Sequence, residues 1–145
     1  MVARALARMP ALEALIEPPA GVLTALGLRL TEIDYRESWF GQLEILKAAQ
    51  ACPELRILKF KARDDEHLAE QKKLLFELIE TKPTLKELDV RFCMLKPKEV
   101  KRLLQAIDKG GSLERLAIIN NHLPRALIRQ LRRLPETHPT LKQVT

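Results

Sequence analysis

Residues 83–95 read PTLKELDVRFCML, and their residue pattern is the clearest indication of the fold. Leu88 and Val90 alternate with charged residues, which is typical of a strand that buries one face and exposes the other. The segment that follows, KPKEVKRLLQAIDKGG, has apolar residues at positions 100, 103, 104 and 107, the spacing of a helix with one buried face. Residues 85–110 are therefore predicted to form a short strand, a turn and a returning helix.

The same L-x-x-L-x-L pattern recurs along the chain. Its first leucines are Leu12, Leu30, Leu55, Leu85, Leu113 and Leu141. The intervals are 18, 25, 30, 28 and 28 residues, so the last three are regular. The second unit could instead begin at Leu23, but the interval to Leu55 would then be 32 residues. The segment RLTEIDYR at 29–36 is preferred because it shares its acidic and arginine positions with KELDVR at 86–91. A period of this size predicts stacked strand–helix units.

Two units extend the pattern to L-x-x-L-x-L-x-x-(N or C)-x-L, with Cys93 in residues 85–95 and Asn121 in residues 113–123. Here the sequence resembles the leucine-rich-repeat family, in its ribonuclease-inhibitor-like and cysteine-containing classes. The resemblance covers about residues 30–144, and loosely the first thirty residues. The unit beginning at Leu55 departs from it, because Arg63 stands where Asn or Cys is expected.

The resemblance implies an α/β right-handed solenoid, with a parallel β-sheet on its concave face and helices on its convex face. The Asn or Cys would point inward and satisfy backbone groups at the turn. The 145 residues suit one domain, with residues 1–28 as an irregular first repeat or cap and residues 29–145 as repeats. Because a repeat pattern begins again near the end, either the last strand caps the sheet or the chain is part of a longer protein. The oligomeric state stays open.

Three more helices are expected from apolar spacing and capping residues. One spans 38–50, with Ser38 as its cap and Trp39, Leu43 and Leu46 inward. The inward residues of the other two are Leu68, Leu75 and Ile79, and then Leu127, Ile128, Leu131 and Leu134 after Pro124. Gly110 is expected to end the helix after Pro97 in the left-handed conformation.

The sequence contains few residues suited to catalysis. His67, His122 and His138 lie in different units and have no metal-ligand spacing, and no phosphate-binding glycine loop is present. Cys93 is interpreted as a structural residue of the turn, and Cys52 as a small buried one. We therefore expect no enzyme, no catalytic or metal-binding residue and no cofactor.

Two cysteines are too few for a disulfide framework, which favours a reducing compartment. The opening residues lack the apolar core of a signal peptide, and no apolar run reaches the ~18–20 residues that span a bilayer. The sequence thus predicts an intracellular protein, cytoplasmic or nuclear, without membrane insertion.

The strand period of two places the third, fifth and seventh residues of each motif on the exposed face. The middle column is Asp34, Lys59, Asp89 and Ala117, and the seventh-place column is Arg36, Lys61, Arg91 and Ile119. Because neighbouring strands lie about 4.8 Å apart, Asp34, Lys59 and Asp89 are expected to pair across the ladder. Arg36, Lys61 and Arg91 would repel one another unless they reach the middle column or a partner. The predicted partner-binding residues are Asp34, Arg36, Lys59, Lys61, Asp89, Arg91, Arg115 and Ile119.

The leading hypothesis is a non-catalytic protein–protein interaction module, namely a scaffold, an inhibitor or a substrate-adaptor arm. Leucine-rich repeats usually bind proteins on the concave face, and the basic stripe favours an acidic partner surface. The alternative is an RNA-binding or export-adaptor domain, since the net charge is +6 and one helix carries Arg125, Arg129, Arg132 and Arg133. RNA recognition usually needs exposed aromatic residues, and Phe92 is the one candidate near the sheet face. As a third interpretation, these charges only keep the surface solvated.

Overall fold

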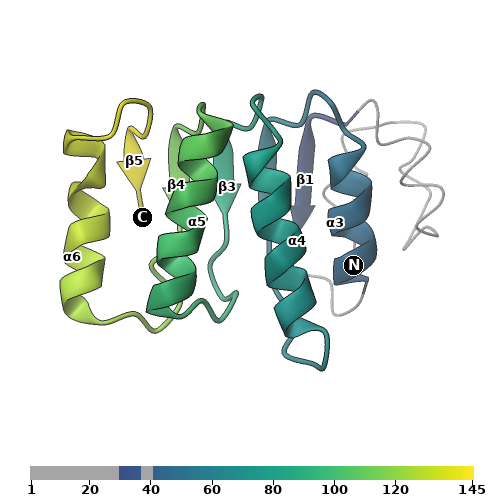
Figure 1. Cartoon of the computed structure of the whole chain (residues 1–145), viewed down its shortest axis with the longest axis horizontal. Helices are drawn as coiled ribbons and strands as arrows, with labels where there is room; N and C mark the ends of the chain where they lie inside the picture. Colours follow the sequence, from purple (N-terminus) through teal and green to yellow (C-terminus); the bar gives the residue numbers. More distant parts are fainter. Residues whose placement is uncertain (1–29, 37–40) are drawn as a thin grey trace.

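The computed structural model describes residues 30–36 and 41–145. Over these residues the predicted α/β class is confirmed, with a sheet of five parallel strands and four α-helices. The strands are β1 Glu32–Tyr35, β2 Ile57–Phe60, β3 Glu87–Asp89, β4 Arg115–Ala117 and β5 Gln143–Val144. The helices are α3 Gln42–Gln50, α4 Leu68–Glu80, α5 Pro97–Gly110 and α6 Arg125–Arg133, with a 3-10 turn η2 at Leu134–Glu136. The strands lie in chain order, and Figure 1 shows all four helices on one face of the sheet.

The strand register joins equivalent positions of successive units. The second apolar position of the motif pairs across the whole sheet, in the series Ile33, Leu58, Leu88, Leu116 and Val144. Equivalent backbone groups also repeat their bonds, because the N–H groups of Lys86, Glu114 and Lys142 each donate to the preceding unit at 2.8 Å. The predicted units from Leu30 onward are thus confirmed in their strand pairing, and Leu12 lies outside the described residues.

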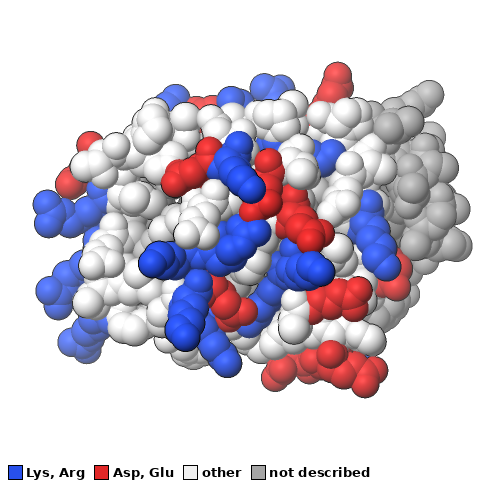
Figure 2. Space-filling model, in the orientation of Figure 1, with Lys and Arg blue, Asp and Glu red and all other residues white. Residues whose placement is uncertain are grey.

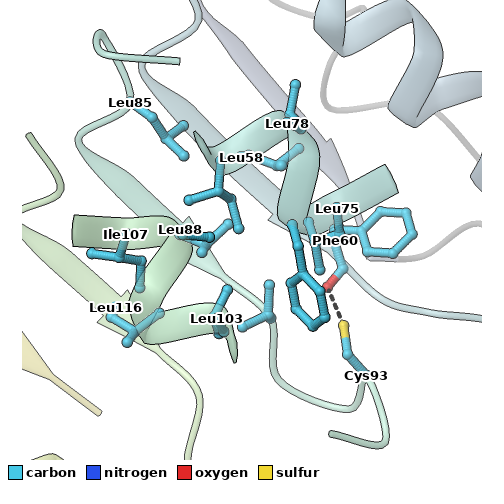
Figure 3. Close-up of a cluster of buried hydrophobic side chains, with 14 of the residues drawn as sticks. Leu58, Phe60, Leu75, Leu78, Leu85, Leu88, Cys93, Leu103, Ile107 and Leu116 are labelled. Atoms are coloured by element: carbon cyan, nitrogen blue, oxygen red, sulfur yellow. Dashed lines mark hydrogen bonds between the residues drawn. The ribbon is translucent and has the colours of Figure 1, made fainter. Parts of the chain in front are cut away.

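The core fills the space between the sheet and the helices. Leu58, Leu88 and Leu116 point from the strands towards α4 and α5, as Figure 3 shows. Leu75 of α4 and Leu103 of α5 meet them from the helix side. Each buried leucine stabilises the fold by roughly 1.5–3 kcal/mol, so stacked units hold one another in place.

The turn after β4 depends on one buried amide. The Asn121 side chain is buried, and its Oδ1 accepts hydrogen bonds from the N–H groups of Cys93 at 2.9 Å and Leu95 at 3.2 Å. Its Nδ2 donates to the carbonyl oxygens of Val90 at 3.1 Å and Ile118 at 2.6 Å. The expected inward orientation is confirmed, and this amide links two successive turns.

The other two turns are satisfied differently. Cys93 points inward as expected, and its thiol donates to the carbonyl of Phe60 at 3.3 Å, the contact drawn in Figure 3. At Arg63, where the motif fails, Gln71 of α4 takes the place of the turn residue. Its Oε1 accepts from the Arg63 N–H at 2.8 Å, and its Nε2 donates to the Arg63 carbonyl at 3.0 Å. A helix side chain therefore replaces the missing Asn or Cys.

The prediction for Gly110 was wrong. Gly110 is the last residue of α5, and the left-handed conformation falls on Gly111, with φ of +80°. Gly110 is required for another reason, because a Cβ there would lie 2.6 Å from the carbonyl oxygen of Ile79. The glycine therefore permits the close approach of α5 to the end of α4.

The other helices differ from prediction mainly at their ends. The structure begins α3 at Gln42 and buries Leu46 as expected, together with Ile45, Ala48 and Ala49, whereas Leu43 is only half-buried. The expected cap Ser38 and Trp39 lie outside the described residues. The helix α4 buries Leu75 and Ile79, as expected, and leaves Leu68 half-buried. The helix α6 buries Leu131, and its Leu127 and Ile128 are half-buried. None of the described helices is long and apolar enough to cross a membrane.

Candidate functional site

The sheet face opposite the helices carries the predicted columns of polar side chains. Lys59 is the direct neighbour of Asp34 on one side and of Asp89 on the other, and Asp89 is the neighbour of Ala117. A hollow of about 200 Å³ lies over this face. Arg36, Lys59, Glu87, Asp89, Arg91, Arg115, Ala117, Gln143 and Thr145 are among its lining residues. Of the eight predicted residues, five line the hollow, whereas Asp34, Lys61 and Ile119 do not.

The expected pairing of Lys59 with the two aspartates was wrong. Each aspartate instead binds the arginine two positions further along its own chain segment. Nε and Nη2 of Arg36 donate to the two carboxylate oxygens of Asp34 at 2.8 and 2.7 Å. The same atoms of Arg91 donate to Asp89 at 3.1 and 2.8 Å. Residues two apart in an extended chain share a face, and a planar guanidinium matches a carboxylate with two bonds where an ammonium cannot.

Arg36 also joins strands that are not adjacent. Its Nη1 lies 3.3 Å from Oδ2 of Asp89, so the side chain crosses β2 to reach β3. The two arginines of the seventh-place column thus reach the middle column, which explains how like charges are accommodated there. The four side chains of Asp34, Arg36, Asp89 and Arg91, hereafter the aspartate–arginine network, span β1 to β3.

Burial separates the two charges of this network. The side chains of Asp34 and Asp89 are 4% and 6% exposed, whereas Arg91 is 39% and Arg115 56% exposed. The acids lie underneath and the bases point outward. Asp34 and Asp89 are consequently too deep to contact a partner, and their role is to position the arginines.

Lys59 and Arg115 complete the hollow. No hydrogen bond or ion pair links the Lys59 ammonium group to any residue within 30–36 and 41–145, although the side chain is half-buried. Arg115 makes one ion pair, from Nη2 to Oε2 of Glu87 at 3.2 Å. Exposed pairs of this kind contribute about 0–1 kcal/mol, so Arg115 is available to an external anion.

Phe92 follows the network at the end of β3. It is the one exposed large hydrophobic residue in the described part of the chain, at 53%. Its φ of +60° is rare for a bulky residue, and its N–H donates to the carbonyl of Asn120 at 2.9 Å. That bond joins the Phe92 backbone to the residue that follows the half-buried Ile119 of the next unit. Left-handed backbone costs a bulky residue about 1–2 kcal/mol and recurs at binding sites. The sequence singled out Phe92 for its aromatic ring, but no sequence pattern indicated its backbone conformation.

The cysteines are unsuited to nucleophilic chemistry. Burial raises the pKa of the Cys93 thiol to about 12 and that of Cys52 to about 11, so both stay protonated at neutral pH. His138 is tied to Asp108 through Nε2 at 2.8 Å, and its Nδ1 accepts two backbone N–H groups. Across the described ranges, no three His, Cys, Asp or Glu side chains gather in a way that would hold a metal ion.

The helix face differs from the sheet face. Figure 2 shows acids interspersed with bases over the middle of the helix face, and Lys and Arg predominating along α6. Arg125, Arg129, Arg132 and Arg133 of α6 are exposed, as predicted. On α5, Arg102 pairs with Glu80 and stacks on Phe76, 5.6 Å from its ring centre. The bases over α4 and α5 are therefore partly neutralised within the fold.

Comparison with known proteins adds no further identification. No family model matches the sequence, and no curated protein or solved structure is significantly similar to the chain.

Proposed function

We propose that this chain is a segment of leucine-rich-repeat solenoid that binds a protein partner on the sheet face opposite the helices. Three features support the repeat assignment. The strands lie in chain order, equivalent positions pair at every step, and inward Asn121 and Cys93 stabilise the turns. Stacked repeats of this kind present a continuous sheet face to partners, as a scaffold, an inhibitor or a substrate-adaptor arm.

One observation carries the binding proposal. Parallel sheets are generally covered on both faces, yet none of the described helices lies on the face that holds the hollow. That face is polar and ordered, because the aspartate–arginine network positions its exposed cations. A preformed polar face with an aromatic residue at its edge suits the recognition of another protein, since Arg and aromatic side chains are enriched at interface centres.

Binding is favoured over catalysis by the state of the titratable groups. The two thiols are buried and protonated, and both carboxylate oxygens of Asp89 already accept hydrogen bonds from two arginines.

The basic residues of α6 make RNA binding the second candidate. Because the helix sequence RALIRQLRR has no aromatic residue on which bases could stack, this candidate has less support.

Site-specific crosslinking tests the proposal. A photoreactive residue is placed at Lys59 or Ile119 on the sheet face, and at Lys101 or Arg129 on the helix face as matched controls. The full chain is irradiated in native extract, and the adducts are identified by mass spectrometry. We expect a discrete protein adduct from the sheet-face positions that is absent from the helix-face positions.

Charge reversal is the second arm of this test. Arg91 is unsuitable for this test, because it neutralises buried Asp89 and its reversal would also destabilise the fold. The double variant Lys59→Glu/Arg115→Glu keeps the bonds between Arg91 and Asp89 and is expected to lose the adduct while staying folded by circular dichroism. Its urea midpoint should be lower than that of the wild type, because the new carboxylates lie beside Asp34, Asp89 and Glu87. Adducts from α6 alone, or RNA binding that disappears in an Arg129→Glu/Arg132→Glu variant, would reject the sheet-face proposal.

A further inference from the structure

We infer that the partner on this face is an acidic, extended polypeptide segment that inserts a carboxylate side chain into the hollow and packs an apolar side chain against Phe92. This inference rests on the proposed function and adds the chemistry of the partner. It follows from the hydrogen-bonding groups, the shape and the edge of the hollow.

The hollow holds more donors than the protein uses. Lys59 offers an ammonium group with no hydrogen bond to the described residues. Arg91 uses Nε and Nη2 for Asp89, so its Nη1 has no protein acceptor among those residues. Arg115 uses Nη2 alone. Three cationic side chains that have unused N–H groups therefore line one small volume.

The carboxylates in the hollow, by contrast, already accept hydrogen bonds from arginine side chains. Oδ1 of Asp89 accepts from the backbone N–H and Nε of Arg91, and Oδ2 accepts from Nη2 of Arg91 and Nη1 of Arg36. Glu87 is held by Arg115. A ligand that brings acceptors and negative charge is therefore favoured, and a ligand that brings donors or positive charge is not. A carboxylate meets this requirement, because charge-assisted bonds to guanidinium are roughly twice as strong as neutral ones.

The shape of the hollow selects an extended segment. Ala117 is the small side chain of the middle column, next to Asp89 on β3. At about 200 Å³ the hollow equals the space of about seven water molecules, so it admits a side chain and not a helix or a folded domain. A segment lying along the face can supply such a side chain at alternate positions.

The apolar edge favours polypeptide over nucleic acid. Phe92 is exposed and directly follows Arg91, which lines the hollow, and its N–H is bonded to the carbonyl of Asn120. Its ring matches an apolar protein side chain next to the carboxylate. Single-stranded nucleic acid is usually bound by several aromatic side chains along a basic groove, and among the described residues this edge offers one exposed aromatic ring, Phe92.

Selection from a peptide library tests the inference. A random twelve-residue phage-displayed library is panned on the full chain, on the double variant Lys59→Glu/Arg115→Glu, and on Lys101→Glu/Arg129→Glu as a control of equal charge change. We expect peptides that contain Asp or Glu with a neighbouring Phe, Leu or Ile. A synthetic copy of a selected peptide should bind the sheet-face variant about tenfold or more weakly, since a close charge pair is reversed, and the helix-face control almost unchanged.

The outcomes separate this inference from the proposed function. Peptides that are neutral or basic, no enrichment, or binding that survives the sheet-face reversal would overturn the acidic-partner inference. A sheet-face crosslink to a protein would in each of these cases still support the proposed function. If oligouridylate competes for the hollow and the acidic peptides do not, the ligand is RNA and the inference is wrong.

Discussion

Arg36 of β1 donates to Asp89 of β3 across the intervening strand, with Nη1 and Oδ2 3.3 Å apart. The contact joins units that are not neighbours in the sheet and leaves Lys59 between them without a carboxylate partner. One arginine thereby stabilises the sheet and frees a cation for external ligands.

Replacement of Arg36 should therefore destabilise the protein. Arg36→Met removes the bonds to buried Asp34 and Asp89, and we expect the unfolding free energy to fall by about 1–3 kcal/mol. Arg36→Lys should recover only part of this loss, because an ammonium lacks the planar pair of N–H groups that forms two parallel bonds to one carboxylate. Urea unfolding followed by circular dichroism measures both variants.

Arg115→Lys is the control on the same face and should change stability by less than about 1 kcal/mol. Equal losses at positions 36 and 115 would contradict a special role for the cross-strand contact.

Asn121→Ala should cause a larger loss. It leaves two N–H groups and two carbonyl groups of the buried turns without their bonds, so we expect a decrease of about 2–4 kcal/mol. The adjacent Asn120 is exposed, and Asn120→Ala should stay within about 0.5 kcal/mol of the wild type. Denaturant midpoints of the two variants provide the comparison. A small effect of Asn121→Ala would mean that water can replace the amide.

Gly110→Ala should lower stability, which is the opposite of the usual effect. A helical Gly→Ala change normally stabilises a protein by roughly 0.5–1 kcal/mol. Here the new Cβ would lie 2.6 Å from the backbone oxygen of Ile79, so we expect a loss of about 1–3 kcal/mol. Gln105→Ala, at an exposed position of the same helix, should be neutral or slightly stabilising. Thermal melts of both variants would reveal the sign, and a stabilised Gly110→Ala protein would refute the close packing of α5 on α4.

Phe92→Asn should separate stability from binding. Asn adopts the left-handed backbone more easily than Phe, so the stability should be unchanged or rise by up to about 1 kcal/mol. Loss of the exposed ring should nevertheless weaken the selected acidic peptides by about tenfold or more, as at interface hot spots. Fluorescence anisotropy with a labelled peptide measures this. If affinity is kept while stability rises, the strained phenylalanine has no role in binding.

Alkaline pH should destabilise the fold through Cys93. Its pKa is raised from 9.0 to about 12 by burial, so between these values the unfolded chain has lost a proton that the native chain keeps. The stability is fully present below pH 9 and falls as the pH rises through this window. Stability measured at pH 8 to 11 should decline less steeply in Cys93→Ala. Iodoacetamide should label Cys93 at pH 8 only after unfolding, and rapid labelling of the native protein would contradict its burial.

Sequence periodicity predicted the parallel strands and the columns on the sheet face, because alternation and repeat interval are local properties. It could not show that Asp34 and Asp89 bind the arginines of their own segments, since Lys59 stood equally close in the ladder. Burial of the acids beneath the bases likewise follows from packing. The replacement of the turn residue by Gln71 was not predictable either, because Gln71 lies eight residues from Arg63 on a helix.

Residue order alone predicted the α/β class, the parallel pairing of equivalent positions and which side chains share each sheet face. These properties follow from apolar spacing, which every strand and helix must satisfy to bury its own face. The packing of distant segments, by contrast, established which cations remain available, why Gly110 is a glycine and that Phe92 has a left-handed backbone. These depend on atoms brought within a few ångströms of one another by residues distant in the chain, and a one-dimensional pattern contains no such distances.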